Sequence, residues 1–191
     1  MKRFRISFIL MTAILLILLS ACSNVKKSGD KLNDFTFTDQ DNKKFGLKDL
    51  KGSVWVADFM FTSCATVCPQ LTKNMSDLQK EIKDKGYDDV KFVSFSVDPE
   101  IDTPKAMKDY AAKFDADFST WHLLTGYSQE DIESFAKDNF QAWVKKPDND
   151  TQVIHDTKFF LMNKDGELVK DYSTQDGFPL SEIVKDVKAL R

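Results

Sequence analysis

Apolar runs and amphipathic repeats alternate along most of the chain. Residues 54–61 form an apolar run without Gly or Pro, which is typical of a strand covered on both faces. Behind it, apolar residues at helical spacing predict a helix from Pro69 to about Lys85. The same patterns predict strands over 90–97, 120–126, 153–162 and 167–172, and helices from Thr103-Pro104, from Ser128 and over about 180–190. Strands and helices therefore follow one another in turn.

Alternation of this kind predicts an α/β fold with a mixed, mostly parallel central sheet flanked by helices. An N-terminal hairpin over 32–45 precedes the sheet, and residues 141–152 form a polar, mobile loop by composition. We expect one domain, 32–191. Because two cysteines follow the first long strand and a helix follows them, the pattern resembles a thioredoxin-type fold. Ligands of such open sheets gather at the carboxyl ends of the strands.

The first residues are typical of an export signal. Lys2, Arg3 and Arg5 precede the uncharged apolar run 6–19, which is short for a membrane span. The run ends in Leu-Ser-Ala-Cys22, which resembles the bacterial lipobox. An ordinary signal peptide with an incidental cysteine and an uncleaved membrane helix are the alternatives.

We therefore predict a lipoprotein signal peptide over 1–21, lipid attachment at Cys22 and a tether over 22–31. The domain would lie on the extracytoplasmic face of the bacterial cell membrane, held there by its lipid. Without residues 1–21 the chain keeps 24 Lys+Arg against 30 Asp+Glu, a net charge of −6. This excess of acidic residues argues against nucleic acid as a partner.

Cys64 and Cys68 are the only thiols of the predicted domain. A disulfide between them would close too short a loop to restrain much unfolded chain, so reactive or metal-binding thiols are favoured over a structural bridge. If Pro69 opens the helix, Cys68 is the N-cap. The positive helix end then predicts a lowered pKa for at least the Cys68 thiol.

The chain has two histidines that could complete a site. His122 lies within a predicted buried strand, where an interior, hydrogen-bonded role is favoured. His155 follows the polar loop, where a side chain can point into a cleft, although a surface or capping role stays open. Two thiolates and an imidazole would select copper or zinc over hard cations, and three ligands suit copper(I). The glutamate and histidine pattern of a zinc hydrolase is missing.

Four segments together resemble the motifs of the Sco (SenC) family over about residues 35–190. They are Cys64–Pro69, Ser96–Pro104, Trp121 with Leu124–Gly126, and Val153–His155 with Phe160-Leu161. The resemblance implies a thioredoxin-fold, membrane-attached copper protein that serves assembly of the dinuclear copper (CuA) centre of cytochrome c oxidase. By that pattern Cys64, Cys68 and His155 are the copper ligands.

The resemblance also implies partners and supporting residues. The partners are oxidase subunit II, which carries the CuA centre, and a copper donor or thiol reductant. By the family pattern Asp98 would support the copper ligands or face a partner protein. The simpler interpretation is that Asp98 belongs to a turn that ends the strand. Asp156 departs from the family, which often has Ser or Thr after the histidine. Its carboxylate would tune the imidazole or point to solvent.

Other functions stay open on the sequence. A thiol-disulfide oxidoreductase would use Cys64 and Cys68 to reduce the cysteines of the CuA site, although three residues separate this pair instead of two. Such reductases usually carry a proline where Asp156-Thr157 stands. A copper or redox sensor is the second alternative. A peroxiredoxin is disfavoured, because Phe61 stands where the peroxidatic pattern requires Thr.

Overall fold

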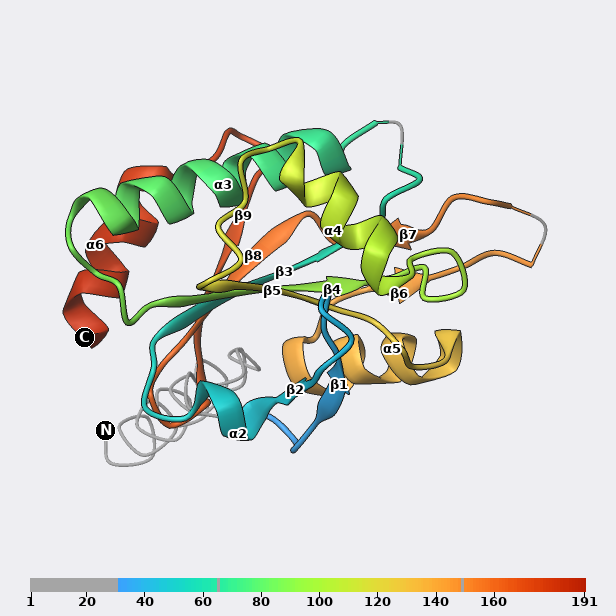
Figure 1. Ribbon diagram of the computed structural model, residues 1–191, viewed down its shortest axis with the longest axis horizontal. Helices are drawn as coiled ribbons and strands as arrows, with labels where there is room; N and C mark the ends of the chain where they lie inside the picture. Colours follow the sequence, from blue (N-terminus) through green and yellow to red (C-terminus); the bar gives the residue numbers. More distant parts are fainter. Residues whose placement is uncertain (1–30, 65, 149) are drawn as a thin grey trace, which may run out of the picture.

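A five-stranded mixed sheet forms the centre of the computed structural model, which describes residues 31–64, 66–148 and 150–191 (Figure 1). Its strand order is β5-β4-β3-β8-β9. β3 (Trp55–Met60), β4 (Lys91–Ser96) and β5 (Trp121–Leu124) are parallel, and β8 (Lys158–Met162) and β9 (Leu168–Ser173) add antiparallel strands beside β3. The predicted α/β fold with a mixed sheet is confirmed.

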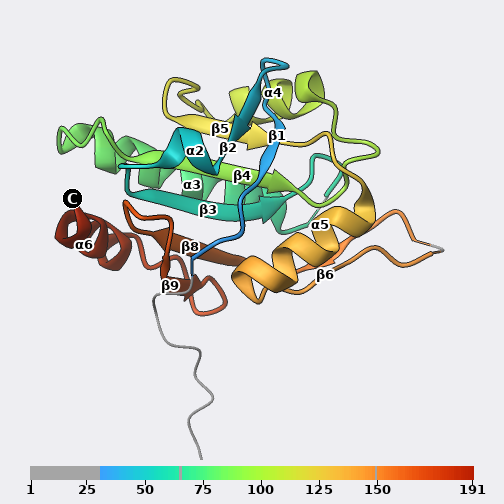
Figure 2. The same cartoon turned by 90° about the horizontal axis from the view of Figure 1, so that it is seen from below.

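Each face of the sheet is covered by its own set of elements (Figures 1 and 2). One face carries α3 (Cys68–Asp84), α4 (Pro104–Ala112) and α6 (Leu180–Leu190). The other carries β1 (Thr36–Thr38), β2 (Lys44–Gly46), α2 (Leu47–Leu50), α5 (Gln129–Phe135) and the π-helix η1 (Ala136–Phe140). β6 (Val144–Lys145) and β7 (Ile154–His155) pair as a separate two-stranded hairpin.

Alternating side chains of the strands divide the core into two layers. In β3, Trp55 and Phe59 pack in the cluster under α5, whereas Val56 and Met60 pack in the cluster under α3. Every residue of β3 is buried. This explains why its sequence, apart from Asp58, is apolar throughout instead of alternating. Both cysteines of the domain belong to the cluster under α5.

Most helix starts follow the caps that the sequence predicts. Thr103 caps α4 through the Ala106 amide, and Ser128 caps α5 through the amide of Asp131. The start of α3 differs by one residue, since Val67 is its N-cap and Cys68 its first residue. Pro69 therefore occupies the second helical position, where its missing amide also costs no hydrogen bond.

The segment before His155 is more regular than its composition indicates. The prediction of a mobile loop over 141–152 is wrong for β6, which lies within it, and the strand predicted over 153–162 is two strands, β7 and β8. Residues 1–21, Cys22 and nearly all of the predicted tether lie outside the described residues. Among the described helices, none combines the length and the apolar character needed to cross a bilayer.

Candidate metal centre

The first thiol sits in the loop that connects β3 to α3. β3 ends at Met60 and α3 begins at Cys68. Within this loop the Sγ atom of Cys64 accepts a hydrogen bond from the backbone amide of Cys68 at 3.4 Å and lies 3.7 Å from Thr66 Oγ1. The amide that opens the helix therefore points at the sulfur of Cys64.

These contacts give Cys64 the more acidic thiol. Burial alone would raise its pKa, but hydrogen bonds from Cys68 and Thr66 outweigh burial, and the pKa of Cys64 is lowered. A hydrogen-bonded thiolate at a helix start is a good nucleophile and metal ligand.

Cys68 has the opposite environment. Its side chain is fully buried, and burial, followed by the neighbouring Cys64, raises the pKa of its thiol. The sequence-based prediction that Cys68 is the acidified thiol is wrong. The first turn of the helix stabilises the sulfur in the preceding loop, and the cysteine inside the turn packs into the core.

His155 reaches this pair from the β6–β7 hairpin. Its Nε2 atom lies 3.6 Å from Cys68 Sγ, and its Nδ1 atom lies 2.9 Å from the backbone oxygen of Asp156. A carbonyl only accepts, so Nδ1 carries the hydrogen and the lone pair of Nε2 faces the sulfur. Burial lowers the pKa of the imidazole, which keeps the ring neutral at neutral pH. A neutral imidazole is the form that binds metals.

Cys68 contacts both other residues: its amide binds the sulfur of Cys64, and its own sulfur lies against Nε2 of His155. Among the described residues, no three His, Cys, Asp or Glu side chains converge tightly enough to form a complete metal cluster. The donor set nevertheless fits a soft metal, since two sulfurs and an unprotonated imidazole nitrogen occupy one end of the sheet.

The two aspartates proposed to support the site bind the backbone and a lysine. The carboxylate of Asp156 accepts a hydrogen bond from the Trp143 amide at 2.9 Å, so it closes the end of the hairpin, while its backbone oxygen orients His155. Asp98 ends β4 in a turn, as the simpler interpretation requires. Its carboxylate is also buried and bound to Lys146 Nζ at 2.8 Å.

A third aspartate, to which the sequence assigned no role, fixes the start of the cysteine loop. Asp102 is fully buried and accepts hydrogen bonds from the amide of Thr62 at 3.1 Å, from its hydroxyl at 2.5 Å and from Ser96 Oγ at 2.6 Å. Burial raises the pKa of Asp102 although these donors lower it. The signal was its place in the segment Ser96–Pro104 that resembles the Sco family, but its partner in the cysteine loop, Thr62, is 40 residues away.

Three acidic side chains hold the hairpin that carries His155. Glu133 of α5 binds Lys145 Nζ and the amide of Lys146, both at 3.0 Å. Lys146 Nζ binds Asp98 and, at 2.9 Å, Glu100. The hairpin is therefore attached to α5 on one side and to the turn after β4 on the other (Figure 1).

His122 takes no part in this arrangement. It lies in β5, and its ring stacks on Phe45 with centroids 3.8 Å apart. Its side chain is half-buried, and its Nδ1 atom is buried but finds no hydrogen-bond partner among the described residues. Burial lowers the pKa of His122, so stacking of a neutral ring takes the place of the expected hydrogen bond.

Comparison with known proteins shows the family of the chain. The family model described as SCO1/SenC matches residues 24–191. The chain belongs to the SCO1/SenC family. A crystal structure of a SCO1/SenC family lipoprotein from Bacillus anthracis is 55% identical, with a TM-score of 0.80, and the match covers 84% of this chain and 94% of that one.

Two further Sco structures are similar. BsSco, reported with a disulfide switch as a member of the Sco family of cytochrome c oxidase assembly proteins, is 47% identical with a TM-score of 0.78, over 88% of this chain and 98% of that one. ScoI of Bradyrhizobium japonicum with copper bound is 28% identical with a TM-score of 0.70, over 85% of this chain and 100% of that one. The predicted thioredoxin-like fold is confirmed by these likenesses.

Proposed function

We propose that this SCO1/SenC family member binds copper through Cys64, Cys68 and His155 and helps to load the CuA centre of cytochrome c oxidase. The observation that carries the proposal is the imidazole nitrogen of His155, which faces the sulfur of Cys68 at 3.6 Å. The copper-bound ScoI structure and the oxidase assembly role of the family of BsSco support it.

The environment of each ligand suits uptake and release of copper. Copper binding requires two deprotonated sulfurs and a neutral ring. Burial keeps the ring neutral, and Cys64 has a lowered pKa, whereas burial raises the pKa of Cys68, so copper would have to displace a proton there. With both sulfurs ionised the copper(II) complex is neutral and the copper(I) complex has one negative charge. Because protons compete with copper for the sulfurs and the ring nitrogen, copper affinity should fall in acid.

The cellular setting is part of the proposal. Copper would pass to subunit II of the oxidase, with a copper donor or thiol reductant acting upstream. A lipid on Cys22 would hold the domain at the extracytoplasmic face of the membrane, with 1–21 removed as a signal peptide and 22–31 as the tether. The lipoprotein nature of the Bacillus anthracis relative supports this part.

Thiol-disulfide exchange is the second candidate, because an acidified Cys64 stands beside a buried Cys68. Such a pair can attack a disulfide through Cys64 and then release the product when Cys68 attacks the mixed disulfide, so that two thiols are oxidised as one partner disulfide is reduced. The disulfide switch of BsSco supports this reading. Neither step uses the imidazole of His155 as a ligand.

His155→Ala separates the two candidates when it is compared with His122→Gln. The full chain in detergent is titrated with copper(I) and copper(II), and oxidase maturation is measured in cells. We expect His155→Ala to weaken copper(II) binding and maturation while Cys64 stays reactive toward disulfides, and we expect His122→Gln to leave both unchanged. Normal copper binding and maturation in His155→Ala would contradict the copper proposal.

A further inference from the structure

The exposed apolar side chains of this protein gather at one end of the molecule. Among the described residues, four large apolar side chains are exposed: Trp143 by 64%, Ile154 by 58%, Ile101 by 56% and Val67 by 45%. All four lie in loops or short strands at the end where β3 and β4 finish. We call these four residues the apolar collar.

Contacts within this end relate the collar to the candidate metal centre. Val67 precedes Cys68, and Ile154 precedes His155. The Trp143 amide binds Asp156, the residue whose backbone oxygen orients the His155 ring. The collar therefore stands next to both sides of the site.

Ile101 joins the collar through the turn after β4. The residues just before it, Asp98 and Glu100, both bind Lys146 of the hairpin. The turn that carries Ile101 and the hairpin that carries Trp143 and Ile154 are thus fixed to one another. Ile101, Trp143 and Ile154 therefore lie on two segments that ion pairs connect.

A hollow continues the collar past Val67 along α3. Its volume is about 500 Å³, and no charged side chain lines it, although 30% of the chain is charged. The residues that line it are Thr66, Val67, Gln70, Leu71, Asn74, Thr157, Thr174, Gln175, Gly177 and Phe178. An uncharged hollow beside exposed apolar side chains is typical of a protein-binding surface.

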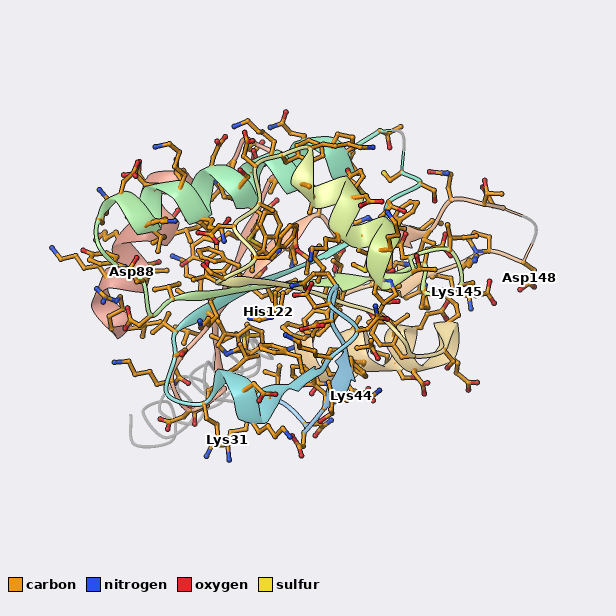
Figure 3. All side chains as sticks on the ribbon, viewed as in Figure 1. Lys31, Lys44, Asp88, His122, Lys145 and Asp148 are labelled. Carbon is orange, nitrogen blue, oxygen red and sulfur yellow. The ribbon has the colours of Figure 1, made fainter. Side chains whose placement is uncertain are left out.

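The position of the collar argues against lipid as its occupant. Lys31, where the described chain begins, pairs with Glu167 in the turn after β8, and this turn lies at the start of β3. Figure 3 shows Lys31 at the other end of the molecule from Lys145 and Asp148 of the hairpin. The collar therefore lies at the end of the domain opposite to the point where the N-terminal segment joins it.

Charge argues against an anionic lipid surface and against a second copy. Asp148 and Asp150 are exposed in the hairpin that carries Trp143 and Ile154. The lysines of that hairpin, Lys145 and Lys146, are already paired with Glu133, Asp98 and Glu100. The chain without residues 1–21 has a net charge of −6. Like charges of this kind oppose self-association and binding to anionic lipid.

We propose that the apolar collar docks a partner protein whose own metal-accepting thiols lie within an apolar face, so that the two sulfur sites meet when the faces close. This rests on the proposed function, which supplies a thiol-bearing copper acceptor. Closing apolar surface around the thiols would exclude water from the transfer. Exposed aromatic and aliphatic anchors of this kind contribute most of the affinity of many protein interfaces.

The test measures docking without copper. The full chain in phospholipid nanodiscs is immobilised, and the metal-free, soluble CuA-bearing domain of oxidase subunit II is the probe in biolayer interferometry, with empty nanodiscs as the blank. We expect Trp143→Ser and Ile154→Thr each to weaken binding about tenfold or more. Val169→Thr, a half-buried apolar position on β9, is the matched control and should bind as the unaltered chain does.

Four results would overturn the collar proposal. The unaltered chain fails to bind the probe, or both collar variants bind it as tightly as the unaltered chain does. Brominated lipids quench tryptophan fluorescence in the unaltered chain but not in Trp143→Ser, which would make lipid the occupant. A self-associated form that Trp143→Ser abolishes would assign the collar to a second copy. Copper titration of the same samples keeps the proposals apart, since a chain that docks through the collar but binds no copper contradicts only the copper proposal.

Discussion

Cys64 and Cys68 are separated by three residues, and the fold gives their thiols different surroundings. The sulfur of Cys64 receives the helix-opening amide, whereas the sulfur of Cys68 is enclosed by the core and faces His155. The sequence shows two cysteines before a helix and so locates the site. It cannot show which thiol is acidified, because a shift of one residue in the helix start moves Cys68 from the N-cap into the first turn, from which its amide binds the sulfur of Cys64.

Alkylation rates should reveal this asymmetry. In the reduced, metal-free chain we expect iodoacetamide to modify Cys64 at least about tenfold faster than Cys68 near pH 7, since the thiolate is the reactive form. The rate at Cys64 should reach half its maximum below the usual thiol pKa of about 9, and the rate at Cys68 above it. Peptide-resolved mass spectrometry measures both. Thr66→Val, which removes one hydrogen bond, should move the midpoint of Cys64 upward; equal rates would contradict the assignment.

Asp58 should make stability depend on pH. It is buried in β3 and accepts a hydrogen bond from Ser94 Oγ at 2.5 Å, and burial raises its pKa to about 7 although that bond lowers it. The folded state therefore binds the proton more tightly than the unfolded chain does. The stabilisation that this difference adds to the unfolding free energy is complete below about pH 4 and is lost as the pH rises through about 7.

Asp58→Asn keeps the acceptor for Ser94 and removes the titration. Urea unfolding at pH 5 and pH 8 measures the effect. We expect the unaltered chain to lose about 2–3 kcal/mol more unfolding free energy between these two pH values than the variant does. The same pH dependence in both proteins would show that Asp58 stays ionised in the folded state.

Among the elements, the β6–β7 hairpin depends most on long-range contacts. Strong local signals made α4, α5 and α6 predictable: a Thr-Pro start, a Ser cap with acidic residues, and an amphipathic repeat. The hairpin has no such signal. Its order comes from Asp98 and Glu133, which lie in other elements, and composition alone therefore indicated a loop.

The structure provides a matched pair of lysines to test how the hairpin is held. Lys146→Met removes the partner of the buried Asp98 carboxylate and should lower the unfolding free energy by about 2–4 kcal/mol. Lys145→Met removes a pair between more exposed side chains and should cost about 0.5 kcal/mol or less. Urea unfolding near pH 7 measures both. Equal costs would show that the Asp98 pair does not hold the hairpin.

Loss of the hairpin attachment should also move His155. The NMR signals of its ring should shift in Lys146→Met and stay unchanged in Lys145→Met, because only the first variant frees the hairpin from the turn after β4. Unchanged His155 signals in Lys146→Met would show that Glu133 and the pairing with β6 are sufficient to orient the ring.

At the scale of the whole molecule, the sheet separates the site from the start of the described chain. The cysteine loop follows the end of β3, and Lys31 lies beside the turn at its beginning. A lipid on Cys22 would thus hold the protein at one end and leave the metal-binding end free. The fold class could be predicted because the alternation of strands and helices is a local pattern, and residue types together with the family resemblance named Cys64, Cys68 and His155 as candidate ligands. The collar could not be predicted, because exposure is a property of the folded surface.

Lipid attachment is tested separately from copper binding. Cys22→Ala should abolish incorporation of labelled palmitate, and Cys68→Ser should leave incorporation unchanged. Label retained in Cys22→Ala would contradict attachment at this residue.

The central claim is that Cys64, Cys68 and His155 together bind copper. X-ray absorption spectroscopy of the full chain loaded with copper(I) tests it most directly, because the spectrum reports the number and kind of atoms around the metal. We predict two sulfur ligands and one imidazole nitrogen, with the imidazole signal retained in His122→Gln and lost in His155→Ala. A spectrum without imidazole, or an imidazole signal that survives in His155→Ala, would contradict the claim.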